Sequence, residues 1–151
     1  MERNQDLVAR AARLAAEAHE GQTDKVGAAY IEHPARVAEF VRSLFVDAPD
    51  EAVAVAWLHD VVEDTKISLQ DLLEAGFPGS VVAAVDSMTK RAGEGMEDYF
   101  ARVRSNPLAV MVKTADLADN TSPERVSRLD PQTAERLRNK YALARKLLAA
   151  A

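Results

Sequence analysis

The sequence predicts an all-α protein, folded as one domain of about seven or eight helices. A chain of 151 residues, 48% of them hydrophobic, fits a single hydrophobic core. Alanine and leucine supply much of the hydrophobic fraction, while β-branched residues other than valine are few, which favours helix over sheet. Apolar residues also recur at helical spacing along the chain. We therefore expect residues 1–151 to form a single helical bundle.

The first two predicted helices are amphipathic and are separated by a polar loop. Apolar residues recur at helical spacing over residues 7–18, before the polar, glycine-containing loop of residues 21–27. The second helix covers residues 34–45. Pro34 suits its first turn, where the missing N–H group is not needed, and this places His33 at or near the N-cap.

The third predicted helix, over residues 51–64, is apolar on nearly all sides until it reaches His59 and Asp60. Such a helix is typical of the centre of a bundle. Residues four apart lie on the same face of a helix. We therefore expect His59 beneath Glu63 and Asp60 beneath Asp64, so that four polar groups share one edge of an otherwise apolar helix.

Capping signals and apolar periodicity define the remaining helices. Ser68 and Asp71 predict a capping box at the start of a short helix, and Gly76 stands in the usual C-terminal position. A strongly apolar helix after Asn106 carries Asp116 and Asn120 at a spacing of four residues. The other predicted helices cover residues 78–88, 96–104 and 131–148.

Charge and composition exclude several classes of function. A formal net charge of −5 argues against broad binding to nucleic acid or to anionic membranes. No apolar run approaches the roughly 20 residues that span a bilayer, and the polar N-terminus has no signal core, so we expect a cytoplasmic protein. The absence of cysteine excludes disulfides and thiolate metal sites. A homo-oligomer stays possible.

Four residues are candidate ligands of one divalent metal ion: His33, His59, Asp60 and Asp116. Burial of unpaired carboxylates is costly, and a bound cation removes that cost. Two imidazoles and two carboxylates suit Mn²⁺, Fe²⁺ or Zn²⁺. A solvated acidic face is the alternative, although the apolar neighbours of His59 and Asp60 argue against it.

Two further acids predict hydrolytic chemistry at such a centre. Water bound to a divalent metal becomes a nucleophile near neutral pH. Glu63 and Asp64, one turn beyond the ligands, are placed to take a proton from that water.

Four segments resemble a known family: residues 18–22, 30–34, 59–65 and 113–120, with the sequences AHEGQ, YIEHP, HDVVEDT and KTADLADN. They resemble the HD-domain phosphohydrolases, and more closely the hydrolase domain of the RelA/SpoT alarmone enzymes and the small stand-alone alarmone hydrolases. This resemblance implies an all-α HD domain with one divalent ion, expected to be Mn²⁺. The ligands it implies are His33, His59, Asp60 and Asp116.

The same resemblance implies a nucleotide substrate. The reaction would be hydrolysis of the 3′-pyrophosphate of guanosine tetra- or pentaphosphate, with Glu63 and Asp64 activating the water. Lys25 and Asn120 would lie at the nucleotide. A chain of this length is expected to lack the synthetase and regulatory domains of the long alarmone enzymes.

The loop before Gly27 departs from the family pattern. Asp24, Lys25 and Val26 stand where the alarmone hydrolases carry Arg-Lys-Ser, and an aspartate cannot replace the planar cation that packs on guanine. We expect Asp24 either to accept hydrogen bonds from guanine or to repel phosphates. The alternatives are therefore an HD-type nucleotide phosphatase of other specificity and a catalytically silent metal-binding sensor module. The presence of Glu63 and Asp64 favours an enzyme.

Overall fold

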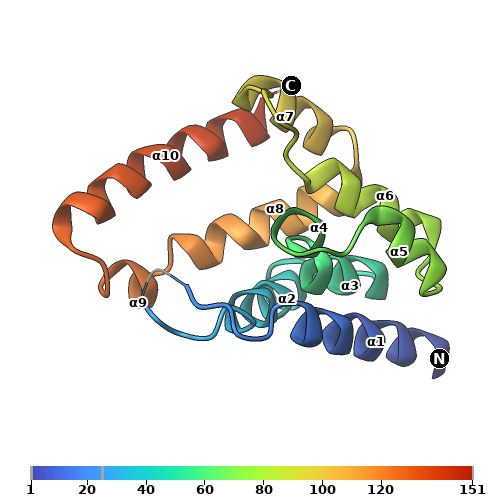
Figure 1. Ribbon diagram of the computed structural model, residues 1–151. Coiled ribbons are helices and arrows are strands. Elements are labelled where there is room, and N and C mark those ends of the chain that lie inside the picture. The colour runs from blue at the N-terminus through green and yellow to red at the C-terminus, as the bar shows by residue number, and fades with distance from the viewer. Residues whose placement is uncertain (1, 25, 151) are drawn as a thin grey trace.

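The prediction of an all-α fold is confirmed by the computed structural model, which describes residues 2–24 and 26–150 (Figure 1). The ten helical segments are α1 (Glu2–Ala18), α2 (Glu32–Leu44), α3 (Asp50–Leu58), α4 (Val61–Asp64), α5 (Leu69–Glu74), α6 (Gly79–Met88), α7 (Met96–Arg104), α8 (Pro107–Asn120), α9 (Pro123–Val126) and α10 (Pro131–Ala149). Because α4 and α9 are single turns of four residues, eight longer helices remain, in agreement with the predicted bundle. Within the described residues there is no strand, only an isolated bridge between Thr23 and Ala29.

Helix α3 lies at the centre of the bundle. It packs against α1, α2, α6 and α8, and its alanines and valines are buried on all sides. Burial of this short helix explains why its sequence lacks a polar face, as expected for a helix surrounded by others. The centre of the fold is therefore the helix that ends directly at His59.

The structure corrects one prediction at this point, because the third helix is not continuous over residues 51–64. Helix α3 ends at Leu58, and α4 begins only at Val61. Consecutive residues of an unbroken helix point about 100° apart. The turn at His59 and Asp60 instead brings their side chains together, with 3.1 Å between His59 Nε2 and Asp60 Oδ2. As a result His59 is buried while Glu63 is exposed, so these two do not share a face.

The predicted helix boundaries at residues 68–76 are confirmed. The Ser68 side chain accepts from the Asp71 N–H group, and the Asp71 side chain accepts from the Ser68 N–H group, which completes the capping box. Gly76 has φ 91°, the left-handed conformation that favours glycine after a helix. The capping box and the C-terminal glycine could be predicted because each depends only on residues close together in the sequence.

The longest helix, α10, forms an outer wall of the molecule. It packs against α7 and α8 and lies on the side of α8 away from α1 (Figure 1). In the described part of the chain, no helix is both long and apolar enough to cross a membrane. Residues of α7, α8 and α10 line the pocket described next.

Candidate metal centre

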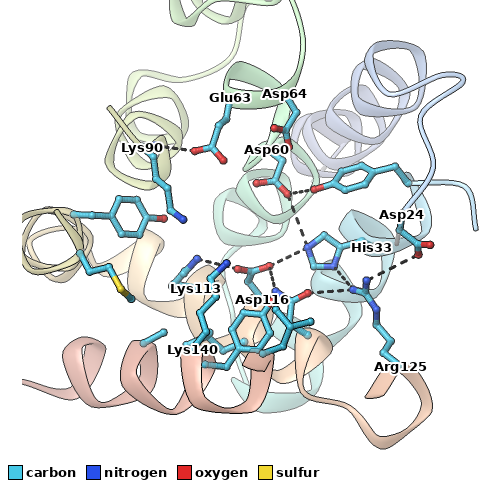
Figure 2. Close-up of a pocket in the computed structure, with 18 of the residues that line it drawn as sticks. Asp24, His33, Asp60, Glu63, Asp64, Lys90, Lys113, Asp116, Arg125 and Lys140 are labelled. Carbon is cyan, nitrogen blue, oxygen red and sulfur yellow. Dashed lines mark hydrogen bonds and ion pairs between the residues drawn. The ribbon is translucent and has the colours of Figure 1, made fainter. Parts of the chain in front are cut away.

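Three packed helices bring the four predicted metal ligands together. His33 lies in the first turn of α2, Asp116 lies on α8, and His59 and Asp60 form the turn between α3 and α4. Helices α2, α3 and α8 all contact one another. Figure 2 shows that His33, Asp60 and Asp116 point toward a common centre. Their packing therefore joins residues that are more than 80 positions apart in the sequence.

The distances between the ligand atoms suit one divalent ion. His33 Nε2 lies 2.9 Å from Asp116 Oδ1 and 3.9 Å from Asp60 Oδ2. His59 Nε2 lies 3.1 Å from Asp60 Oδ2 and 3.5 Å from Asp116 Oδ1. Two ligand atoms that each bind an ion at about 2.1 Å are themselves roughly 3.0–3.4 Å apart in octahedral or tetrahedral geometry. Three of the four spacings lie within about 0.1 Å of this range, and the fourth, between His33 Nε2 and Asp60 Oδ2, is about 0.5 Å longer.

Hydrogen bonds set both imidazoles to present Nε2 to the centre. His59 Nδ1 donates to the Ala56 carbonyl at 2.7 Å, and His33 Nδ1 donates to Asp119 Oδ2 at 2.6 Å. A neutral imidazole with a proton on Nδ1 carries its lone pair on Nε2. His59 Nε2 is buried and has no hydrogen-bond partner among the described residues. The histidines and Asp60 could therefore hold a metal ion.

Charges around the centre keep its carboxylates ionised. Burial raises the pKa of Asp116, but Lys113, whose Nζ lies 3.0 Å from Asp116 Oδ2, and the two histidines hold it well below its ordinary value. Burial also opposes ionisation of Asp60, and the neighbouring imidazole of His59 lowers its pKa. Two ionised carboxylates are what a divalent cation requires.

The same carboxylates act on the histidines. Burial lowers the pKa of each imidazole, but hydrogen bonds and charges from the surrounding aspartates raise the net pKa of His33 and of His59. A metal ion would compete with those protons for Nε2, so its binding would release protons.

A second row of side chains supports the ligands from behind. The Tyr30 hydroxyl donates a short hydrogen bond to Asp60 Oδ2. Asp119 is fully buried and accepts from His33, from Arg36 Nε at 2.7 Å and from Arg125 Nη1 at 2.9 Å. Burial raises the pKa of Asp119, but the hydrogen bonds and charges of His33 and Arg36 lower it to about 2. Hydrogen bonds from Tyr30 to Asp60 and from His33 to Asp119 thus fix the positions of two candidate ligands.

The two predicted catalytic acids lie at the edge of the centre and are exposed. In Figure 2, Asp64 stands beside Asp60, and Glu63 faces Lys90, whose backbone N–H donates to Glu63 Oε1 at 2.8 Å. Carboxylate oxygens of Asp60, Glu63 and Asp64 lie within 4.8 Å of one another. Partial burial and the charges of Asp60 and Glu63 raise the pKa of Asp64, which makes it a stronger base.

The centre opens into a pocket of about 820 Å³. Lysines line the side that faces the acids, namely Lys90, Lys113 and Lys140, and Figure 2 shows them directed toward the same space. Tyr99 and Tyr141 add aromatic surface. A cavity of this size, with cations and aromatic rings beside a metal centre, suits a phosphorylated small molecule of nucleotide dimensions.

Two of the three predicted substrate-binding residues, Asp24 and Asn120, line the pocket. Asp24 lines its rim, but Asp24 Oδ1 accepts from the Val26 and Ala28 N–H groups at 2.9 and 3.0 Å, which fixes the loop. Asn120 also lines the pocket and donates to Asp116 Oδ1 at 3.2 Å, as expected from their spacing. Lys25 lies outside the described residues. Contact of Asp24 and Asn120 with a substrate stays a prediction.

Residues that sequence reasoning did not assign to the site come from several elements. Asp119 carried a weak signal, because it is a second acid on an apolar helix, three residues after Asp116. Tyr30 precedes His33 by three residues but has no pattern of its own. Arg125 gave no signal, because only the fold brings α9 to the loop of residues 21–30, where Arg125 Nη2 lies 3.9 Å from Asp24 Oδ2.

Comparison with known families identifies the class of protein. The model of the HD domain family matches residues 11–151, which is most of the chain, and the chain therefore belongs to the HD domain family. A solved structure from a study of a metazoan ortholog of SpoT that hydrolyzes ppGpp has the same fold, with a TM-score of 0.76 at 20% sequence identity. That match covers 95% of this chain and 86% of the other.

Named relatives indicate the branch of the family. The chain is 35% identical over 116 residues to guanosine-3′,5′-bis(diphosphate) 3′-pyrophosphohydrolase of Haemophilus influenzae, which covers 72% of this chain and 17% of that protein. It is 42% identical over 77 residues to the protein of the same name from Vibrio cholerae, over 51% of this chain and 10% of that protein. The chain thus spans less than a fifth of the length of these relatives.

Proposed function

We propose that this protein is a divalent-metal-dependent hydrolase that removes the 3′-pyrophosphate from guanosine 3′,5′-bis(diphosphate) or a related nucleotide. The convergence of His33, His59, Asp60 and Asp116 on one centre supports this proposal most directly. The names of the relatives support the choice of substrate. The mixed nitrogen and oxygen set suits Mn²⁺, Fe²⁺ or Zn²⁺, and the resemblance to the alarmone hydrolases makes Mn²⁺ the proposed ion among them.

Different residues of the chain would have different roles in such a reaction. When bound, a divalent ion supplies polarisation of a phosphoryl oxygen and activation of water. Asp64, with its raised pKa, takes the proton from the attacking water, and Glu63 is a second acceptor at the same edge. The water oxygen bonds to phosphorus as the bond to the 3′ oxygen breaks, so pyrophosphate is released and the 3′ oxygen takes up a proton to become a hydroxyl group. Lys90 and Lys113 line the pocket where negative charge accumulates.

One observation favours a second candidate, an HD-type nucleotide phosphatase of broader specificity. Selection of guanine needs hydrogen-bonding groups or a planar cation aimed at the base. In the loop of residues 23–28, Asp24 instead accepts from two backbone N–H groups and faces Arg125. A carboxylate held in this way has less capacity left to select guanine.

Substrate selection follows from the loop. Incubation of the Mn²⁺-loaded protein with guanosine 3′,5′-bis(diphosphate) should release pyrophosphate. The adenine counterpart should be hydrolysed with kcat/KM within about tenfold, a difference of roughly 1.4 kcal/mol. Chromatography of the products over a nucleotide panel measures both. Hydrolysis of simple nucleoside phosphates but of neither bis(diphosphate) would overturn the first candidate in favour of the second.

Metal binding should stabilise the fold. An ion at about 100 times its Kd adds about 2.7 kcal/mol to the free energy of unfolding, which raises the Tm by about 5–10 °C for a chain of this size. Thermal melts with Mn²⁺ and with a chelator measure the shift, and elemental analysis gives the metal content. The Asp60→Asn variant is the matched control, since the chelator should no longer change its Tm. Metal-free protein with an unchanged melting curve would contradict the proposed centre.

A further inference from the structure

Asp119 stands out among the buried groups because its side chain faces away from the candidate metal centre and is not a ligand. Its side chain is 0% exposed, yet it carries a negative charge in the last turn of α8. Three donors surround it: His33 Nδ1 at 2.6 Å, Arg36 Nε at 2.7 Å and Arg125 Nη1 at 2.9 Å. Burial of a charge is costly unless it is paired and hydrogen-bonded, so an apolar residue would suit the fold better if this site had no task.

We propose that Asp119 is a positioning residue of the metal centre, which holds His33 in the tautomer and orientation that present Nε2 to the ion, and that Arg125 in turn holds Asp119. This inference rests on the metal centre required by the proposed function. Imidazoles that bind metals generally donate their other N–H group to a carboxylate or carbonyl, and loss of that partner weakens metal binding.

The hydrogen-bond pattern around His33 Nδ1 supports this role. A carboxylate only accepts, so the contact of 2.6 Å with Asp119 Oδ2 requires the proton on His33 Nδ1. Arg125 Nη1 also lies 3.3 Å from His33 Nδ1, but an arginine only donates and cannot bond to an Nδ1 that carries a proton. Arg125 Nη1 instead donates to Asp119 Oδ2 and to Asn120 Oδ1. Asp119 therefore keeps the proton on His33 Nδ1, the nitrogen that faces away from the centre.

Arg125 extends the arrangement to the rim of the pocket. In Figure 2 its guanidinium group lies between His33 and Asp24, and Arg125 Nη2 is 3.9 Å from Asp24 Oδ2. The side chain of Asp24 is 6% exposed, so this pair is largely shielded from solvent. The charges of Arg36 and Arg125 balance those of Asp24 and Asp119. His33, a candidate metal ligand, is thus connected to Asp24 in the loop of residues 21–30 through Asp119 and Arg125, neither of which is a candidate ligand.

The test is the affinity of the folded protein for Mn²⁺ alone, measured by competition with a chelator. Asp119→Asn leaves three donors to share one carbonyl oxygen, and its affinity should fall about 10- to 100-fold. Nitrogen-15 NMR of the histidines, without added metal, should show that His33 loses its proton from Nδ1. Asp86→Asn removes a partly exposed carboxylate that pairs with Arg91 at the surface, and should change neither readout.

Variants of Arg125 keep the inference testable should Asp119→Asn prove unstable. Arg125→Gln leaves Asp119 with His33 and Arg36, and should weaken Mn²⁺ binding severalfold, while Arg125→Lys should restore part of the loss. The inference is overturned by unchanged affinity in these variants, or by a lower affinity of Asp119→Asn with His33 still protonated at Nδ1. A parent protein that binds no Mn²⁺ would instead overturn the proposed function.

Discussion

Replacement of Asp60 with asparagine should abolish both metal binding and hydrolysis while the helical fold stays intact. Asp60 Oδ2 lies 3.1 Å from His59 Nε2 and 3.9 Å from His33 Nε2, so it borders both imidazoles. An asparagine can still accept from the Tyr30 hydroxyl through its carbonyl oxygen. Because Oδ2 is also the oxygen nearest both imidazoles, a neutral carbonyl oxygen then takes the place of a charged one, and the centre loses one of the two ionised carboxylates that a divalent cation requires.

The expected loss is large because the ion contributes several kcal/mol to catalysis, on the order of 10³-fold or more in kcat. Elemental analysis of the purified variant, together with pyrophosphate release in Mn²⁺, measures the two effects. The Asp86→Asn variant controls for loss of a carboxylate elsewhere. An Asp60→Asn protein that retains stoichiometric metal and parental turnover would refute the assigned ligand set.

The second large effect separates chemistry from metal binding. Glu63→Gln and Asp64→Asn should each lower kcat by about 10² or more, the scale of a lost general base, with metal content near that of the parent. Both acids are exposed and cluster with Asp60, separately from the group of His33, His59 and Asp60. Because Glu63 also accepts from the Lys90 N–H group, Glu63→Gln keeps an acceptor for that contact.

Steady-state kinetics at saturating Mn²⁺, with metal analysis of the same samples, distinguishes these roles. Glu17→Gln is a matched control, since Glu17 is exposed on α1 away from the pocket. If both variants turn over like the parent protein, the proton acceptor lies elsewhere. If they instead lose the metal, these acids are ligands rather than bases.

Much of the fold was predictable because the sequence signals for a helix lie within the helix and next to its ends. Caps such as Ser68 with Asp71, breaks such as Asn106 before Pro107, and apolar periodicity all depend on residues within one or two turns. The break at His59 and Asp60 was not predictable in this way. Nothing in the local sequence resembles a stop signal, and the turn is held by tertiary contacts such as the Tyr30 hydrogen bond to Asp60.

The candidate site divides in the same manner. The role of His33, His59, Asp60 and Asp116 as metal ligands stays a prediction that the family resemblance implies, but their proximity was predictable because polar residues are conspicuous on apolar helices. Their supporting partners were not. Arg125 reaches Asp119 and Asp24 only because α9 folds back beside the loop of residues 21–30. The residues next to Arg125 in the sequence contain no pattern that would predict its ion pair with a buried aspartate.

The small size of the residues between the central helices has a consequence for evolution of the site. Alanines such as Ala56 on α3 and Ala115 on α8, next to His59 and Asp116 in space or sequence, are fully buried. The distance between packed helices depends on the side chains at their contact. Small side chains at such positions allow α3 and α8 to pack closely, which helps to set the distance between His59 and Asp116. A larger side chain at either alanine would change the spacing of the candidate ligands without replacing any of them. Substitutions in the hydrophobic core can therefore alter which cation such a site accepts.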